Sequence, residues 1–143
     1  MSRSPTGDAL RVLLLDDDER ILKLRGSMLQ QRGCEVAGVT NVGDGLEALA
    51  GAPRFDLVIV DINLGGGPDD RSGIEFARRV RETDADLPIV GYSATFSERD
   101  LADEERGVFE RTFARGMARM DDLAEITDWM VKLARDRRPP DAE

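Results

Sequence analysis

Acidic residues follow two short apolar segments of the chain, at positions where oxygen ligands could bind a cation or a phosphoryl group. Asp16-Asp17-Asp18 comes directly after segment 10–15, and Asp61 comes directly after segment 57–60. Both segments are short and rich in Leu, Val and Ile, which is typical of strands buried on both faces of a parallel sheet. A buried helix is the alternative for the second segment, but its short length and β-branched residues favour a strand.

Polar residues also follow two later strand-like segments. Parallel strands joined by right-handed helical crossovers all end at the same edge of the sheet, and ligand chemistry belongs at that edge. The candidates that the sequence assigns to it are Asp16, Asp17, Asp61, Ser93 after segment 88–92, and Arg115 after segment 110–114.

Carboxylates gathered at one edge would repel one another. A like-charged pair about 4 Å apart, at an effective dielectric of about 20, costs up to about 4 kcal/mol. A divalent cation would relieve this repulsion, and oxygen ligands without histidine or cysteine favour Mg²⁺. The alternative for Asp16-Asp17-Asp18 is a plain helix start, where acidic side chains interact favourably with the helix dipole.

Composition excludes several other functions. The chain has no histidine, which removes histidine-based acid–base catalysis and histidine metal sites. Its net charge of −9 argues against nonspecific binding to nucleic acid or to an anionic membrane. There is neither an apolar stretch of about 18 residues nor a hydrophobic signal segment at the start, so we expect a cytoplasmic protein. The single cysteine, Cys34, is expected to be a buried structural thiol.

Strand-like and helix-like segments alternate along the chain. Strands are predicted near 10–15, 34–39, 55–64, 88–92 and 110–114, each followed by a helical pattern. This alternation predicts an α/β doubly wound sandwich around a parallel sheet. We expect one domain over 9–135, with a flexible leader over 1–8 and a flexible tail over 136–143.

Local patterns predict where the helices begin and which faces they bury. Ile21, Leu24 and Met28 form an apolar stripe widened by Leu22 and Leu29, and Gly33 ends that helix. The segment 44–47 resembles a capping pair, and 72–75 has the Ser-x-x-Glu form of a capping box. The last helix begins near position 121, and its apolar face consists of Leu123, Ile126, Met130 and Leu133.

Several of these features together resemble the receiver domain of two-component response regulators. They are the acidic pair in Leu15-Asp16-Asp17-Asp18, the apolar strand ending in Asp61, the segment 88–94 and the amphipathic last helix. The resemblance covers nearly the whole chain and implies a flavodoxin-like (βα)5 fold with strand order 2-1-3-4-5. It also implies a stand-alone signalling protein, not an enzyme beyond its own phosphorylation and dephosphorylation.

The same resemblance implies roles for individual residues. Asp61 would accept a phosphoryl group from a sensor histidine kinase or a histidine phosphotransfer protein. Asp17 would bind Mg²⁺ directly, Asp16 directly or through water, and Asn63 through its backbone carbonyl. The hydroxyl of Ser93 would hydrogen-bond the phosphoryl oxygen and shift the adjoining loop. The signal would pass to a downstream protein by direct contact, and a homodimer is compatible with this.

Three features depart from the family pattern. The family has a lysine and a proline at the end of its fifth strand, where Arg115-Gly116 is the best match, and arginine binds phosphate as a planar fork. Thr112 stands at the position of the usual switch aromatic, with Phe113 next to it. The loop 65–71 lacks the usual Met-Pro and is expanded.

Two alternative functions remain open at this point. A degenerate receiver that binds its partner without phosphorylation would fit the missing lysine and switch aromatic. A phosphatase of the haloacid dehalogenase type would use Asp16-Asp17-Asp18 as its Asp-x-Asp motif and Ser93 at a later strand end. That family needs a further lysine and leaves Asp61 without a role.

Overall fold

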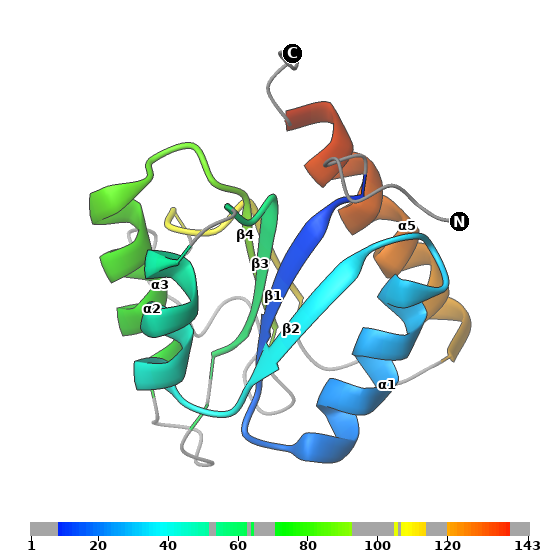
Figure 1. The fold of residues 1–143 in the computed structure, drawn as a ribbon, viewed down its shortest axis with the longest axis horizontal. Coiled ribbons are helices and arrows are strands. Elements are labelled where there is room, and N and C mark those ends of the chain that lie inside the picture. The colour runs from blue at the N-terminus through cyan, green and yellow to red at the C-terminus, as the bar shows by residue number, and fades with distance from the viewer. Residues whose placement is uncertain are drawn as a thin grey trace.

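A five-stranded parallel sheet lies between two layers of helices (Figure 1). The computed structural model describes residues 9–51, 54–62, 64, 71–92, 105, 107–113 and 120–137. The strands are β1 Arg11–Leu15, β2 Glu35–Val39, β3 Leu57–Asp61, β4 Ile89–Tyr92 and β5 Arg111–Phe113. The helices are α1 Glu19–Gln30, α2 Val42–Ala50, α3 Ser72–Thr83 and α5 Met120–Arg137. The predicted helix near 97–107 falls almost entirely outside the described residues.

The strand order is β2-β1-β3-β4-β5, which confirms the expected flavodoxin-like sheet. Helices α2 and α3 cover one face, and α1 and α5 cover the other (Figure 1). Successive side chains of a strand point to opposite faces, so β1 and β3 contribute to both halves of the core. Leu13, Leu15, Val58 and Val60 pack toward α2 and α3. Val12, Leu14, Leu57 and Ile59 pack toward α1 and α5. Burial on both faces explains why these strands read as continuous apolar runs.

Helix α1 lies where the sequence predicts but ends at Gln30, before Gly33, and one residue of its stripe is misplaced. The Asp18 side chain caps the helix by accepting the backbone N–H of Arg20 at 2.9 Å, and Gly33 follows the helix with φ +88°. Leu24 is 37% exposed, so its predicted place in the core is wrong. The buried arc is centred near Leu29, and Leu24 lies about 140° away from Leu29 around the helix.

Both predicted capping pairs are wrong. Helix α2 starts earlier than expected, because Asn41 caps it and accepts the backbone N–H of Asp44 at 2.8 Å. Helix α3 has Arg71 at its N-cap without a side-chain capping bond, and Ser72 is already helical. The backbone N–H of Gly73 donates instead to the carbonyl of Ile62 at 3.1 Å. The carbonyl of Ile62, the residue directly after β3, therefore satisfies one of the free N–H groups in the first turn of α3.

Helix α5 buries the predicted face. Leu123 and Met130 are buried, with Ile126 and Leu133 partly buried against the same core. The helix continues to Arg137, whose guanidinium forms two hydrogen bonds of 2.8 and 2.7 Å to the Glu110 carboxylate. This pair joins the last turn of α5 to the segment that enters β5. The predicted tail boundary at position 135 thus falls inside the helix.

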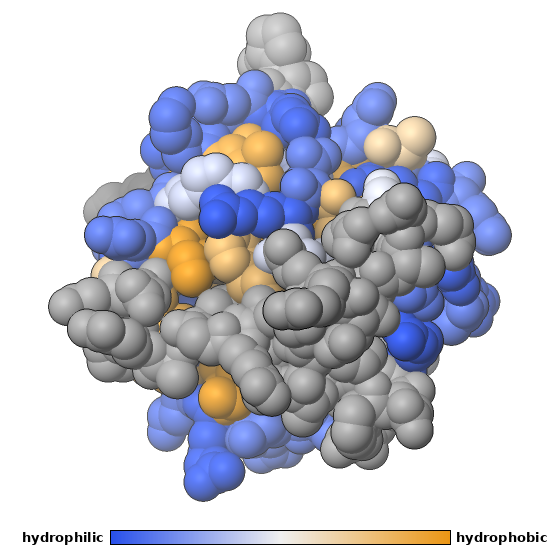
Figure 2. Space-filling view, turned by 180° about the vertical axis from the view of Figure 1, so that it is seen from behind, coloured by the Kyte–Doolittle hydropathy of each residue, from blue (hydrophilic) through white to orange (hydrophobic). Residues whose placement is uncertain are grey.

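On the face seen from behind, the described surface is mostly hydrophilic, and hydrophobic residues show in separate patches (Figure 2). Cys34 is buried, as expected, directly before β2. Within the described part of the chain, no helix has the length and apolar character needed to cross a bilayer.

Candidate metal centre

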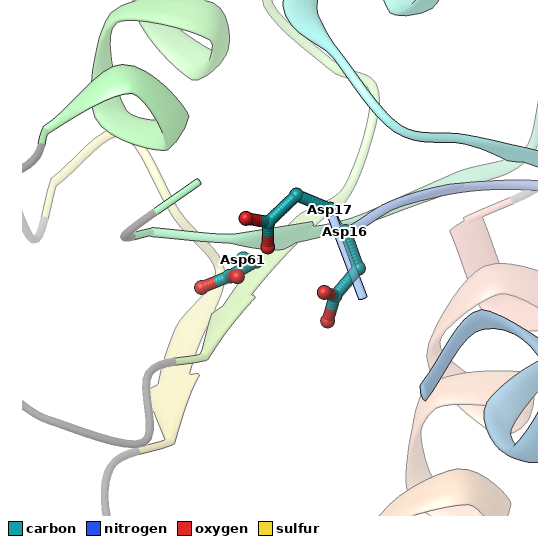
Figure 3. Close-up of side chains that lie close together, drawn as sticks. All are labelled: Asp16, Asp17 and Asp61. Atoms are coloured by element: carbon teal, nitrogen blue, oxygen red, sulfur yellow. The ribbon is translucent and has the colours of Figure 1, made fainter. Parts of the chain in front are cut away.

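The pairing of β1 with β3 brings the predicted acidic residues together. Leu15 pairs with Val60, so Asp16 and Asp17 leave the sheet next to Asp61, the last residue of β3. Carboxylate oxygens of these three residues all lie within 4.8 Å of one another. In Figure 3 the carboxyl groups of Asp17 and Asp61 point to the same side, and the carboxyl group of Asp16 points downward beside them. The cluster predicted from the sequence is confirmed as a spatial arrangement.

Asp16 is the buried member of the cluster. It is only 3% exposed, and its Oδ1 accepts the backbone N–H of Asp18 at 2.8 Å. Its Oδ2 accepts a short hydrogen bond from the hydroxyl of Tyr92. Burial raises the pKa of Asp16 above its ordinary value, and the charge of Asp17 raises it further, against the lowering effect of the two hydrogen bonds. A cation beside this carboxylate would stabilise its ionised form.

Asp17 and Asp61 face outward. Asp17 is exposed and Asp61 is half-buried, so a ligand can approach both from solvent. Pairing with Tyr92 of β4 fixes the backbone of Asp61, and the first turn of α3 packs against its carbonyl group through Gly73. Asp61 thus sits on a rigid strand end but presents its side chain to solvent.

The donor set suits a hard divalent cation. Three carboxylates from two neighbouring strands supply oxygen ligands, and no sulfur or imidazole lies among them. Mg²⁺ commonly uses one or two carboxylates and keeps several waters, which the exposed side of this cluster leaves room for. Asp16, Asp17 and Asp61 could therefore hold a magnesium ion.

Tyr92 is the contact that the sequence reasoning missed. It is 7% exposed, and the Arg25 guanidinium of α1 lies over its ring at 4.0 Å. Burial and the neighbouring Asp16 carboxylate raise the pKa of Tyr92 well above its ordinary value, so the hydroxyl stays a donor. The sequence did carry a signal for this contact, since its one tyrosine stands at the end of a predicted buried strand. A buried tyrosine hydroxyl needs a hydrogen-bond partner, and Asp16 at the end of another strand was a candidate.

The remaining predicted site residues cannot be placed. Asn63, Ser93 and Arg115 lie outside the described residues, as does the loop 65–70. On β5, Thr112 is buried, and Phe113 packs edge-on against Trp129 of α5 with ring centroids 5.9 Å apart. The aromatic of this strand therefore faces α5, one residue after the position that the resemblance assigned to the switch.

The chain is similar to response regulators. The response regulator receiver domain family matches residues 12–106. The transcriptional regulatory protein PdtaR of Mycobacterium tuberculosis is 37% identical over 109 residues, covering 71% of this chain and 49% of PdtaR. The nisin biosynthesis regulatory protein NisR of Lactococcus lactis is 33% identical over 91 residues, covering 64% of this chain and 37% of NisR.

A solved response regulator has a similar fold. The response regulator TrrA of Thermotoga maritima, in complex with Mg²⁺-BeF, superposes with a TM-score of 0.66 at 26% identity, over 85% of this chain and 98% of TrrA. The chain belongs to the response regulator receiver domain family. It spans about half or less of the length of the two curated relatives named here.

Proposed function

We propose that this receiver domain accepts a phosphoryl group on Asp61 from a histidine kinase or a histidine phosphotransfer protein, with Mg²⁺ held by Asp16 and Asp17. The observation that carries the proposal is the cluster of three carboxylates whose oxygens lie within 4.8 Å of one another. Asp61 is the half-buried member at the tip of β3, and its side chain is open to a donor that approaches from solvent.

The reaction needs little beyond position and charge. An Asp61 carboxylate oxygen attacks the phosphorus atom, the phosphorus–nitrogen bond of phosphohistidine breaks, and the histidine nitrogen keeps the electron pair. Phosphoryl transfer depends mainly on alignment and on neutralising charge on the oxygens. Bound Mg²⁺ would supply that neutralisation. The rigid end of β3 supplies the alignment, because the β4 pairing and α3 hold the Asp61 backbone.

Three further roles follow from the family resemblance. The backbone carbonyl of Asn63 would supply a further oxygen ligand to the ion. The hydroxyl of Ser93 binds the new phosphoryl oxygen, and Arg115 takes the place of the usual lysine. The response then passes to a downstream protein by direct contact.

The structures of TrrA support the proposal by analogy. That protein has been solved with Mg²⁺-BeF, and also in complex with the histidine kinase ThkA. BeF bound with Mg²⁺ stands in for a phosphoryl group on a carboxylate. A histidine kinase is also the kind of partner that we propose for this chain.

A second candidate is a receiver that works without phosphorylation. Buried Thr112 on β5, in place of an aromatic residue, favours it, because the usual aromatic switch is missing there. In this case the fold and its partner surface would remain, but the carboxylates would carry no phosphoryl group.

Beryllofluoride binding separates the two candidates. Mg²⁺ and beryllofluoride should form a complex with the wild-type protein, measured by isothermal titration calorimetry, and Asp61→Asn should abolish it. Asp136→Asn is the matched control, because Asp136 is an exposed carboxylate at the far end of α5, paired only with Lys132 among the contacts described. Wild-type protein that binds neither Mg²⁺ nor beryllofluoride would favour the phosphorylation-independent receiver.

A further inference from the structure

Tyr92 reaches the metal centre from the last residue of β4. Its backbone pairs with Asp61, whereas its side chain lies on the face of the sheet that α1 and α5 cover. From there the hydroxyl donates to Oδ2 of Asp16, 76 residues away in sequence. Tyr92 thus contacts one proposed metal ligand through its side chain and is paired with the phosphoacceptor through its backbone.

Two donors from different elements fix the Asp16 carboxyl group. The backbone N–H of Asp18 binds Oδ1 at 2.8 Å, and the Tyr92 hydroxyl binds Oδ2. One donor alone would leave the carboxyl group free to rotate, because the terminal torsion of aspartate has a broad minimum. With both donors the plane of the group is set. Each oxygen keeps a second lone pair for a cation, since a carboxylate can accept about four bonds.

The tyrosine ring is itself held in place. The guanidinium of Arg25 lies over its face at 4.0 Å, and the ring is buried in the core shared by α1 and α5. The Nε of Arg25 is buried and has no hydrogen-bond partner among the described residues. Stacking on the ring is therefore a principal contact of that part of Arg25, and it restricts movement of the ring away from Asp16.

We propose that Tyr92 is a positioning residue of the metal centre, whose hydroxyl holds the buried Asp16 carboxylate in the orientation that receives Mg²⁺. The inference rests on the proposed function, because it assumes that Asp16 takes part in Mg²⁺ binding. Packing alone does not require a tyrosine, since phenylalanine would fill the same space. The hydroxyl adds a buried polar group, which is costly to bury unless it is bonded.

Removing the hydroxyl has two opposing effects on Mg²⁺ affinity. A carboxylate with one donor fewer is more basic and attracts a cation more strongly. It also loses its fixed orientation, and water cannot replace the hydroxyl at a side chain that is 3% exposed. Outer partners of metal ligands typically contribute 10- to 100-fold in metal affinity, so we expect the loss of orientation to prevail.

The test is Mg²⁺ titration of Tyr92→Phe by isothermal titration calorimetry. This variant keeps the ring and its contact with Arg25, so the fold is retained, and a urea unfolding curve without Mg²⁺ checks this. The dissociation constant for Mg²⁺ should rise by about 10- to 100-fold. Thr127→Val is the matched control, because it removes a buried hydroxyl that donates to the Leu123 carbonyl within α5. Its Mg²⁺ affinity should equal that of the wild type.

The outcomes separate this inference from the proposed function. If the wild type binds Mg²⁺ and beryllofluoride but Tyr92→Phe binds Mg²⁺ equally well or more tightly, Tyr92 has no positioning role and the proposed function stands. If the wild type binds no Mg²⁺, both fail. If the inference holds, the Mg²⁺ concentration needed for half-maximal labelling of Asp61 by acetyl phosphate rises by the same factor as the dissociation constant.

Discussion

Gly73 lies where the fold leaves little room behind Asp61, the proposed phosphoacceptor. An added Cβ would overlap the Asp61 carbonyl oxygen and lie 2.7 Å from Cα of Ile62. These are backbone atoms of a strand end held between β1 and β4, so they cannot move aside as a flexible side chain would. Overpacking of this kind costs about 1–3 kcal/mol. Alanine gains back about 1 kcal/mol over glycine in a helix, so Gly73→Ala should lose up to about 2 kcal/mol of unfolding free energy.

Gly26 is the matched control for this substitution. It also lies in a helix, but an added Cβ would meet only Cγ1 of Val36, at an ordinary contact distance of 3.7 Å. Gly26→Ala should therefore stabilise the protein by about 0.5–1 kcal/mol, through the reduced entropy of the unfolded chain. The same chemical change is thus expected to have opposite signs at two helical positions.

Urea unfolding followed by circular dichroism measures both variants. The midpoint should fall for Gly73→Ala and rise for Gly26→Ala, with the slope m unchanged in each. Because the atoms displaced at position 73 belong to Asp61 and Ile62, Gly73→Ala should also weaken Mg²⁺ binding, and Gly26→Ala should not. Equal stability of the two variants would refute the close packing of α3 against the end of β3.

Three further predictions concern single residues. Burial raises the pKa of the Asp16 carboxyl group above 3.8, so the folded state binds a proton on Asp16 more tightly than the unfolded state does. Protonated Asp16 therefore stabilises the fold at low pH, and this contribution is lost as pH rises through the folded pKa. Asp16→Asn should therefore be more stable than the wild type at pH 7 without Mg²⁺, and urea midpoints should converge below about pH 4. Burial also raises the pKa of the Cys34 thiol, so its reaction with a disulfide reagent should be slower in the folded protein than in urea. Equal rates would contradict its burial. Arg115→Ala should leave labelling by acetyl phosphate largely intact but reduce the accompanying change in Trp129 fluorescence, and an unchanged response would place Arg115 outside the switch.

The sheet and the acidic cluster could be predicted because their signals are local and strong. A strand buried on both faces must be apolar throughout, so β1 and β3 stand out in the sequence. The carboxylates come directly after these strands, and the family resemblance supplied the order that makes the strands neighbours. Pairing of Leu15 with Val60 then brings the cluster together without further assumption.

The helix starts and Tyr92 could not be predicted in the same way. At α2, both Asn41 and Asp44 satisfy the rules for a cap, and the local pattern does not say which one the chain uses. At α3, the helix begins without a side-chain cap, and the Gly73 N–H donates to the carbonyl of Ile62, directly after β3. The bond from Tyr92 to Asp16 joins β4 to the end of β1, and no spacing rule connects residues so far apart.

The most direct test of the account is to find where acetyl phosphate modifies the protein. Wild-type protein incubated with acetyl phosphate and Mg²⁺ should gain one acid-stable, hydroxylamine-sensitive phosphoryl group, located on Asp61 by mass spectrometry of its peptides. The modification should disappear without Mg²⁺ and in Asp61→Asn, and should persist in Asp136→Asn. A wild-type protein that stays unmodified with Mg²⁺ present, or that is modified at another residue, would contradict the assignment of Asp61 as the phosphoacceptor.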